Sequence, residues 1–253
     1  MAICMFFAIC VTTYILMQRN TSIIILFLVF FTLKAFSQQE PRLGIAVKPI
    51  VPSALFNNES LTIAKNKVQF TVDPQVGYSA GVVLRKDLPS LLSFETGIYY
   101  VRRIYKLNIT DSAGGSTENK FRFVNYEVPI TGLIYIRLSE NLYLNNTFGI
   151  SLDFFPNSIF TENEYYQQRA ERNYWVLPGL IADVGAEYRT EKSGNFYIGG
   201  SYHRMLLPMA NTIVAYKNNG IEESVITPLS GHYFAFNIRY FFPTQRTPAI
   251  DYF

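Results

Sequence analysis

Few residues in this chain have the types and spacing that chemistry requires. Ser201 and His203 lie two positions apart, and Glu187 belongs to the segment before them. A serine nucleophile and its imidazole base must lie within about 2.6–3.2 Å of each other, whereas residues two apart on one strand face are farther apart than that. We therefore interpret Ser201 and His203 as packing residues. His203 and His232 are the only histidines, so a His-rich metal site is not expected.

Charged residues of both signs recur on the polar face of the predicted strands described below. The candidate residues for a network in the lumen are Arg85, Glu95, Arg103, Glu127, Arg137, Asp183, Glu187 and Arg239. Asp153 lies on the same face as these residues. If that face is enclosed, an unpaired charge would cost several kcal/mol, so we predict a network of salt bridges and hydrogen bonds. We expect no catalytic residue, no cofactor and no metal in this set.

Alternation of apolar and polar residues predicts the elements that position these side chains. It persists over ten or more residues in most segments, longer than the usual strand of a soluble protein. The predicted strands cover 43–51, 75–84, 92–103, 124–137, 142–154, 174–188, 196–207 and 232–242.

The connections between these strands alternate between short and long. Short, turn-rich links are expected at 87–90, 139–141 and 190–195, and long polar loops at 52–71, 108–119, 156–173 and 208–230. This order is typical of an eight-stranded antiparallel up-and-down barrel. In a membrane barrel, the short turns would face the periplasm and the long loops the outside of the cell.

The composition of the two strand faces predicts which face lies against lipid and which faces the lumen. Bulky apolar residues such as Ile134 share one face, and polar residues such as Thr131 share the other with many glycines. The interior of eight strands is only just wide enough for side chains, so the glycine-rich polar face fits inside and the apolar face fits against lipid. We predict an all-β transmembrane barrel; a soluble periplasmic barrel that binds a ligand is an alternative.

The N-terminal segment 1–37 is predicted to be a cleavable signal peptide. It has no acidic residue, and Arg19 precedes the apolar run 22–33, which is too short for a spanning helix. Residues 1–16 are interpreted as an upstream extension of a start at Met17, and 38–253 as the barrel domain. Cys4 and Cys10 both fall in the leader, so the mature chain has no thiolate ligand. With 22 Lys+Arg against 19 Asp+Glu, no nucleic-acid partner is expected.

The run 126–129 (YEVP), with Tyr135 downstream, resembles the signature of the PorT-like outer-membrane β-barrel domains of Bacteroidetes. The 37–38 cleavage region, the run 184–188 (VGAEY) and the aromatic last strand are also similar to that family. The resemblance implies an outer-membrane barrel, and the founding member serves protein secretion. The tail 243–253 departs from the family, which usually ends on the aromatic strand.

These observations together predict a small integral outer-membrane barrel with a structural, binding or secretion-accessory role and a lumen filled by polar side chains. The expected partners are outer-membrane lipid and a protein that meets the long extracellular loops. An outer-membrane enzyme acting on lipid or peptide is the other alternative.

Overall fold

The computed structural model describes residues 40–53, 60–88, 91–190, 192–218 and 220–243. The predicted leader 1–37 and all of the tail except Pro243 lie outside these residues. The segment Pro41–Phe253 forms one compact unit, and its described part contains thirteen β-strands. Within the described ranges, no helix has the length and apolar character needed to cross a membrane.

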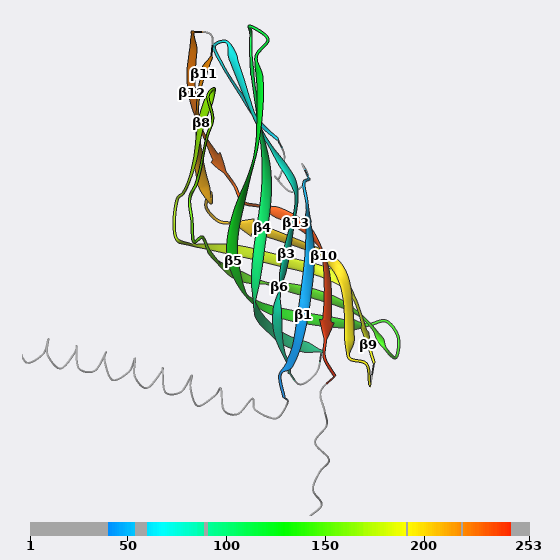
Figure 1. Ribbon diagram of the computed structural model, residues 1–253. Helices are drawn as coiled ribbons and strands as arrows, with labels where there is room; N and C mark the ends of the chain where they lie inside the picture. The colour runs from blue at the N-terminus through cyan, green and yellow to red at the C-terminus, as the bar shows by residue number, and fades with distance from the viewer. Residues whose placement is uncertain (1–39, 54–59, 89–90, 191, 219, 244–253) are drawn as a thin grey trace, which may run out of the picture. The chain divides into compact units, whose positions relative to one another are not determined.

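Strand pairing closes the sheet into a barrel (Figure 1). In the nine-stranded sheet β2 pairs only with β3, and the remaining eight strands form a ring because β1 pairs with both β13 and β3. The ring consists of β1 (Arg42–Val51), β3 (Val68–Asp87), β4 (Leu92–Asp111), β5 (Ser116–Arg137), β6 (Leu142–Phe154), β9 (Val176–Arg189), β10 (Asn195–Met205) and β13 (Tyr233–Phe241). The predicted eight-stranded antiparallel barrel is confirmed.

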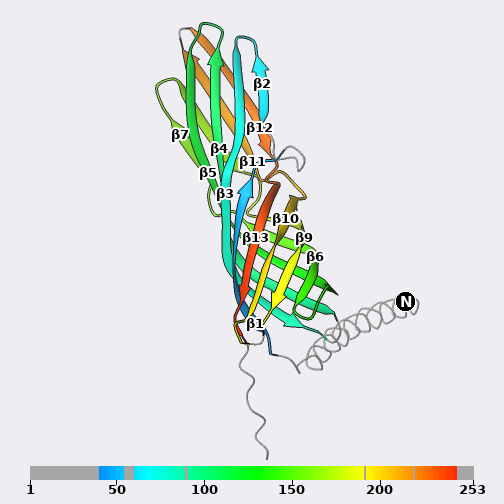
Figure 2. The same ribbon diagram turned by 90° about the vertical axis from the view of Figure 1, so that its right-hand side faces the viewer.

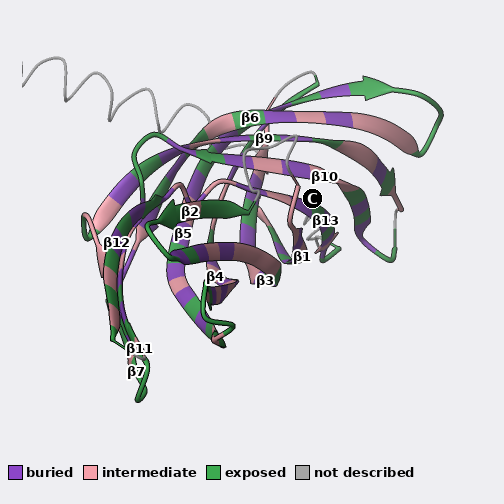
Figure 3. Ribbon diagram, turned by 90° about the horizontal axis from the view of Figure 1, so that it is seen from above, coloured by how far each residue is buried: buried purple, intermediate pink, exposed green. Residues whose placement is uncertain are grey.

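The outer face of the barrel is apolar and the inner face is polar. Ile134 is 56% exposed, whereas Thr131, on the other face of the same strand, is 3% exposed. Viewed along the barrel, buried and exposed residues alternate along the strands (Figure 3). A soluble barrel needs the opposite arrangement, with its apolar face inside. The soluble ligand-binding alternative is therefore wrong, and the barrel is of the membrane-spanning type.

Aromatic side chains border the apolar face at both ends. At the long-connection end, Tyr100 contacts Tyr78 and Tyr126 at ring distances of 6.0 and 6.1 Å. At the short-turn end, Tyr240 contacts Phe196 at 5.0 Å. Tyr126 and Ile136 are ten residues apart on β5. At about 3.3 Å per residue and a tilt of about 40°, that separation spans roughly 25 Å, the height of the lipid-facing band of membrane barrels.

The predicted long polar loops are instead largely strands, which corrects the sequence interpretation. They contain β2 (Leu61–Lys65), β7 (Ile159–Glu162), β8 (Tyr166–Arg172), β11 (Ala210–Asn218) and β12 (Ile221–Leu229). Four of these form a second sheet in the order β12-β11-β8-β7, and β2 pairs with the end of β3. Beyond the ring, β3, β4 and β5 continue past their last barrel partners (Figure 2). We call this assembly of the second sheet, β2 and the three strand extensions the two-sheet unit.

A shared apolar core explains why these segments form strands. The inward face of β4 carries Glu95 and Arg103 in the barrel, then Tyr105, Leu107 and Ile109 beyond it, so the face changes from charged to apolar where the second sheet begins. The buried cluster joins both sheets. It consists of Val68, Phe70, Val72, Tyr105, Leu107, Ile109, Phe121, Phe123, Phe155, Tyr166, Ala170, Leu177, Met205, Met209, Ala210, Val214, Tyr216, Val225 and Leu229.

Polar contacts join the two sheets near their tips. The Tyr216 hydroxyl donates to Asp111 Oδ2 at 2.7 Å, and this hydrogen bond lowers the pKa of the Asp111 carboxyl. Along one seam, Lys65 Nζ lies 3.6 Å from Glu223 and donates to the Ser224 carbonyl at 2.8 Å, so β2 is joined to β12.

Two exposed isoleucines provide a matched test of the lipid-facing surface. Ile150 lies mid-strand on the outer face of β6, and Ile226 lies on the two-sheet unit; they are 49% and 66% exposed. Ile150→Arg should destabilise the barrel by about 2–4 kcal/mol, because the charge enters hydrocarbon near the midplane. Ile226→Arg should stay within about 0.5 kcal/mol, as is usual for a surface substitution in water. Urea unfolding in lipid vesicles measures both; equal effects would contradict the membrane assignment.

Candidate functional site

Five of the predicted lumen residues form a chain of alternating charge at the short-turn end of the barrel. Glu187 accepts a hydrogen bond from Arg85 Nη1 at 2.6 Å, and Arg85 Nε donates to Glu95 Oε2 at 3.1 Å. Glu95 Oε1 then accepts from Arg239 Nη1 at 2.6 Å, and Arg239 also pairs with Asp183. The chain starts and ends on β9 and includes residues of β3, β4 and β13. It therefore links strands from opposite sides of the ring.

Aromatic rings complete the surroundings of the two arginines. The guanidinium of Arg85 lies 3.7 Å from the ring centre of Phe241, and that of Arg239 lies 4.6 Å from Tyr197. Space for Tyr197 comes from two paired glycines, because a Cβ at Gly185 would lie 2.8 Å from its Cζ and one at Gly199 would collide with its hydroxyl. The glycines of the inner face thus make room for the network that fills the lumen.

Arg137 does not belong to this network. It is exposed, and its Nε donates to the Ser139 carbonyl at 3.1 Å in the short turn after β5. The preceding inward-facing residue, Tyr135, is 2% exposed. The alternation of buried and exposed residues therefore holds as far as Tyr135. Arg137 is the last residue of β5, and its side chain is exposed to solvent. Its assignment to the lumen was wrong.

A second polar cluster occupies the lumen nearer the long connections and includes the predicted residues Glu127 and Arg103. Glu127 Oε2 accepts from the Tyr233 hydroxyl at 2.5 Å, and Lys48 Nζ lies 3.9 Å from Oε1. Arg103 donates to Asn125 Oδ1 at 2.5 Å. The Asn125 amide in turn donates to Asp153 at 2.7 Å, so the cluster spans several strands.

His203 belongs to the second cluster but does not have the geometry of a hydrolytic base. Its Nε2 lies 2.9 Å from Ser151 Oγ and 3.0 Å from Asp153 Oδ2, and its ring stacks on Tyr233. In a catalytic triad, the carboxylate binds the imidazole nitrogen opposite to the one that faces the nucleophile. Here hydroxyl and carboxylate meet the same nitrogen, and His203 is 0% exposed. Glu187 belongs to the other cluster, paired with Arg85.

Glu127, Asp153 and His203 are also the residues that could hold a metal ion, since their ligand atoms lie within 4.8 Å of one another. One nitrogen and two carboxylates would suit a transition metal. The two carboxylates, however, share this cluster with two cations, Lys48 and Arg103, and all are at most 3% exposed. Two buried cations therefore already lie in the same cluster as the two carboxylates, and a divalent cation would add further positive charge. The arrangement fits a structural hydrogen-bonded network.

Sequence reasoning missed several members of this cluster. Lys48 lies on the buried face of β1 with Ala46 and Ile50, while its neighbour Val47 is 49% exposed. Assigning the two faces of the first strand would have identified Lys48. Asn125 and Tyr233 also lie on faces recognised as polar, but neither carries a charge that would have singled it out.

The closed ring, the apolar outer face and the charged interior together define a membrane-spanning β-barrel.

No family model and no curated protein matches the chain. Solved structures that are similar to it include the following three. The outer membrane protein OprG from Pseudomonas aeruginosa has 11% identity and a TM-score of 0.48 over 81% of this chain and 95% of that one. The β-domain of the Bordetella autotransporter BrkA has 10% sequence identity and a TM-score of 0.33, over 81% of this chain and 98% of that one. The outer membrane protease OmpT from Escherichia coli has 11% sequence identity and a TM-score of 0.30, over 79% of this chain and 93% of that one.

Glu95 is the most informative residue for testing the network, because it bridges two arginines. Glu95→Gln keeps the size of the side chain but removes the carboxylate that pairs with both Arg85 and Arg239, which breaks two buried ion pairs at once. We expect a loss of about 3–5 kcal/mol in the free energy of unfolding, the usual effect of breaking a buried pair. Arg137→Gln, at the exposed strand end, should change it by less than about 0.5 kcal/mol. Urea titration in vesicles gives both values; similar effects would show that the lumen charges are solvated.

Proposed function

We propose that the protein is an integral protein of the bacterial outer membrane, in which the barrel is a non-conducting anchor and the two-sheet unit is the part that binds. One observation carries the proposal: three barrel strands continue without interruption into a two-sheet unit with its own apolar core. Such a unit presents rigid surfaces on the long-connection side, where binding functions usually lie in barrel proteins. No catalytic step is included in the proposal.

The filled lumen supports the anchoring role of the barrel. The charged side chains of both clusters are at most 6% exposed, and ion pairs connect strands from opposite sides of the ring. A diffusion channel needs a hydrated path, which eight strands with filled interiors do not provide. The apolar core of the two-sheet unit begins directly beyond the second cluster, since Met205 follows His203 by two residues on the buried face of β10.

The resemblance of the run 126–129 to PorT-like domains extends the proposal to an accessory role in protein secretion. Glu127 of that run is a lumen residue bonded to Tyr233. Its environment is therefore structural, and a secretion partner would meet the two-sheet unit rather than this motif. The extracellular orientation of the two-sheet unit is part of the same proposal.

Conductance in planar bilayers tests the anchor role. Folded, heat-modifiable protein should insert without producing discrete current steps, because no open path crosses the lumen; a porin inserted under the same conditions is the positive control. Reproducible steps from the folded protein would contradict the proposal. Fractionation should recover the protein with the outer membrane after a carbonate wash, and recovery in the soluble periplasmic fraction would contradict the location.

A further inference from the structure

The two seams between the sheets of the two-sheet unit differ. At one seam, β2 and β12 are joined by Lys65 and Glu223. At the other, the edge of β5 faces β7, and the pairing of β5 with β6 ends at Tyr126 and Phe154. Between the edge of β5 and the Pro156–Thr161 segment lies a cleft of about 850 Å³. The second seam is therefore open.

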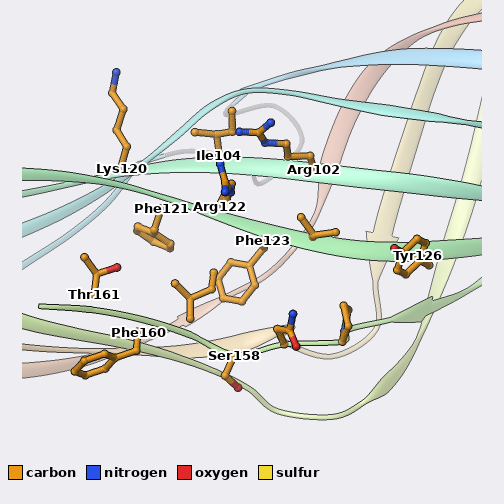
Figure 4. A pocket seen from close by; sticks show the side chains of 14 residues that line it. Arg102, Ile104, Lys120, Phe121, Arg122, Phe123, Tyr126, Ser158, Phe160 and Thr161 are labelled. Atoms are coloured by element: carbon orange, nitrogen blue, oxygen red, sulfur yellow. The ribbon is translucent and has the colours of Figure 1, made fainter.

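The cleft has walls of different chemistry (Figure 4). Phe121 and Phe123 lie on the side of β5 that faces the Ser158–Thr161 segment, and both belong to the buried apolar core. On the other side of the β4–β5 pair lie Arg102, Ile104, Lys120 and Arg122. The mouth of the cleft is thus cationic, while its inner wall is aromatic.

The cations at the mouth are arranged on adjacent strands and form no ion pair with the described carboxylates. Arg102 pairs with Val124 across β4 and β5, and Ile104 pairs with Arg122, so the two arginines are diagonal neighbours, about 7–8 Å apart or somewhat less at Cβ. Among the described residues, no carboxylate lies within ion-pair distance of Arg102, Arg122 or Lys120. The nearby Glu118 is bound by Lys106 at 2.6 Å, and this hydrogen bond, the charge of Lys106 and, more weakly, the charge of Lys120 lower its pKa.

This cationic mouth lies immediately beyond the aromatic border of the lipid-facing band. Arg102 follows Tyr100 by two residues on the outer face of β4, and Val124 precedes Tyr126 in the same way on β5. The guanidinium of Arg102 lies 5.9 Å from the ring centre of Tyr78. Aromatic borders mark the depth of the membrane interface, so Arg102 lies at the level of the lipid headgroups, and Arg122 and Lys120 follow it on the side away from the membrane.

We propose that the mouth of this cleft binds the phosphate of an anionic membrane lipid in the leaflet at the long-connection end. Arg102 and Arg122 would bind the phosphate by charge-assisted hydrogen bonds, with Lys120 adding a third positive charge. Val124 and Tyr126, on the same face and nearer the membrane, would contact the apolar part of the lipid next to the phosphate. The inference deepens the proposed function, since it rests on the membrane location and names a ligand of the two-sheet unit.

A peptide strand added to the free edge of β5 is the competing occupant. It would use backbone hydrogen bonds, to which the three cations on the outer face contribute nothing. The position of Arg102 at headgroup depth favours the lipid. Binding of a lipid should depend on its phosphate group and on the two arginines, whereas binding of a peptide strand should depend on neither.

Native mass spectrometry of the purified barrel in non-ionic detergent tests the proposal with two lipids that differ only in phosphate. Dioleoyl phosphatidic acid should form a one-to-one adduct, and dioleoylglycerol should not. Arg102→Gln combined with Arg122→Gln should weaken the adduct about tenfold or more, because charge-assisted hydrogen bonds are lost. The control Lys67→Gln combined with Lys217→Gln removes two exposed cations near the tips and should leave affinity within about twofold.

Three outcomes would overturn the inference: equal adducts with the two lipids, unchanged affinity in the double-arginine variant, or displacement of phosphatidic acid by millimolar inorganic phosphate. The last would show that a free anion is the ligand. Heat-modifiable migration, measured on each sample, shows that the variants are folded. A folded barrel that fails to bind would contradict this inference alone, whereas recovery outside the outer membrane would contradict the proposed function.

Discussion

The pairing of β1 with β3 is the constraint on which the rest of the structure depends. It closes the ring, and closure leaves no unpaired strand edge in the lipid, where an unpaired backbone group costs several kcal/mol. Closure also fixes the size of the lumen. Because eight strands leave space for side chains only, every charge inside must meet a partner there, and the chain from Glu187 to Asp183 satisfies this requirement.

Much of the barrel could be predicted from the sequence because two environments impose period two on long strands. β6 was predicted with the observed bounds, and Glu95, Arg239 and Asp183 were placed on the inner face. Alternation does not determine which residues meet across the lumen, since that depends on tilt and register. Nor does it hold at strand ends, where Arg137 turns to solvent.

The two-sheet unit could not be predicted by the same reasoning. Its strands are as short as four residues, and in water the outward face needs no apolar side chains, so segments such as β7 and β8 look like polar loops. The signal that could have indicated β2 and the start of β3 is local. Val68, Phe70 and Val72 alternate with polar residues after Asn66, which has the positive φ of a tight hairpin turn.

Hydrogen–deuterium exchange of the reconstituted protein tests the central claim most directly: one closed ring inside the membrane that continues into a packed two-sheet unit outside it. The account predicts slow exchange both for β1 and β3 at their pairing and for the apolar-core segments Val68–Val72, Tyr105–Ile109 and Val214–Tyr216, whose amides are paired and covered. Rapid exchange of those core segments beside a protected barrel would show that the long connections are loops, and would contradict the account.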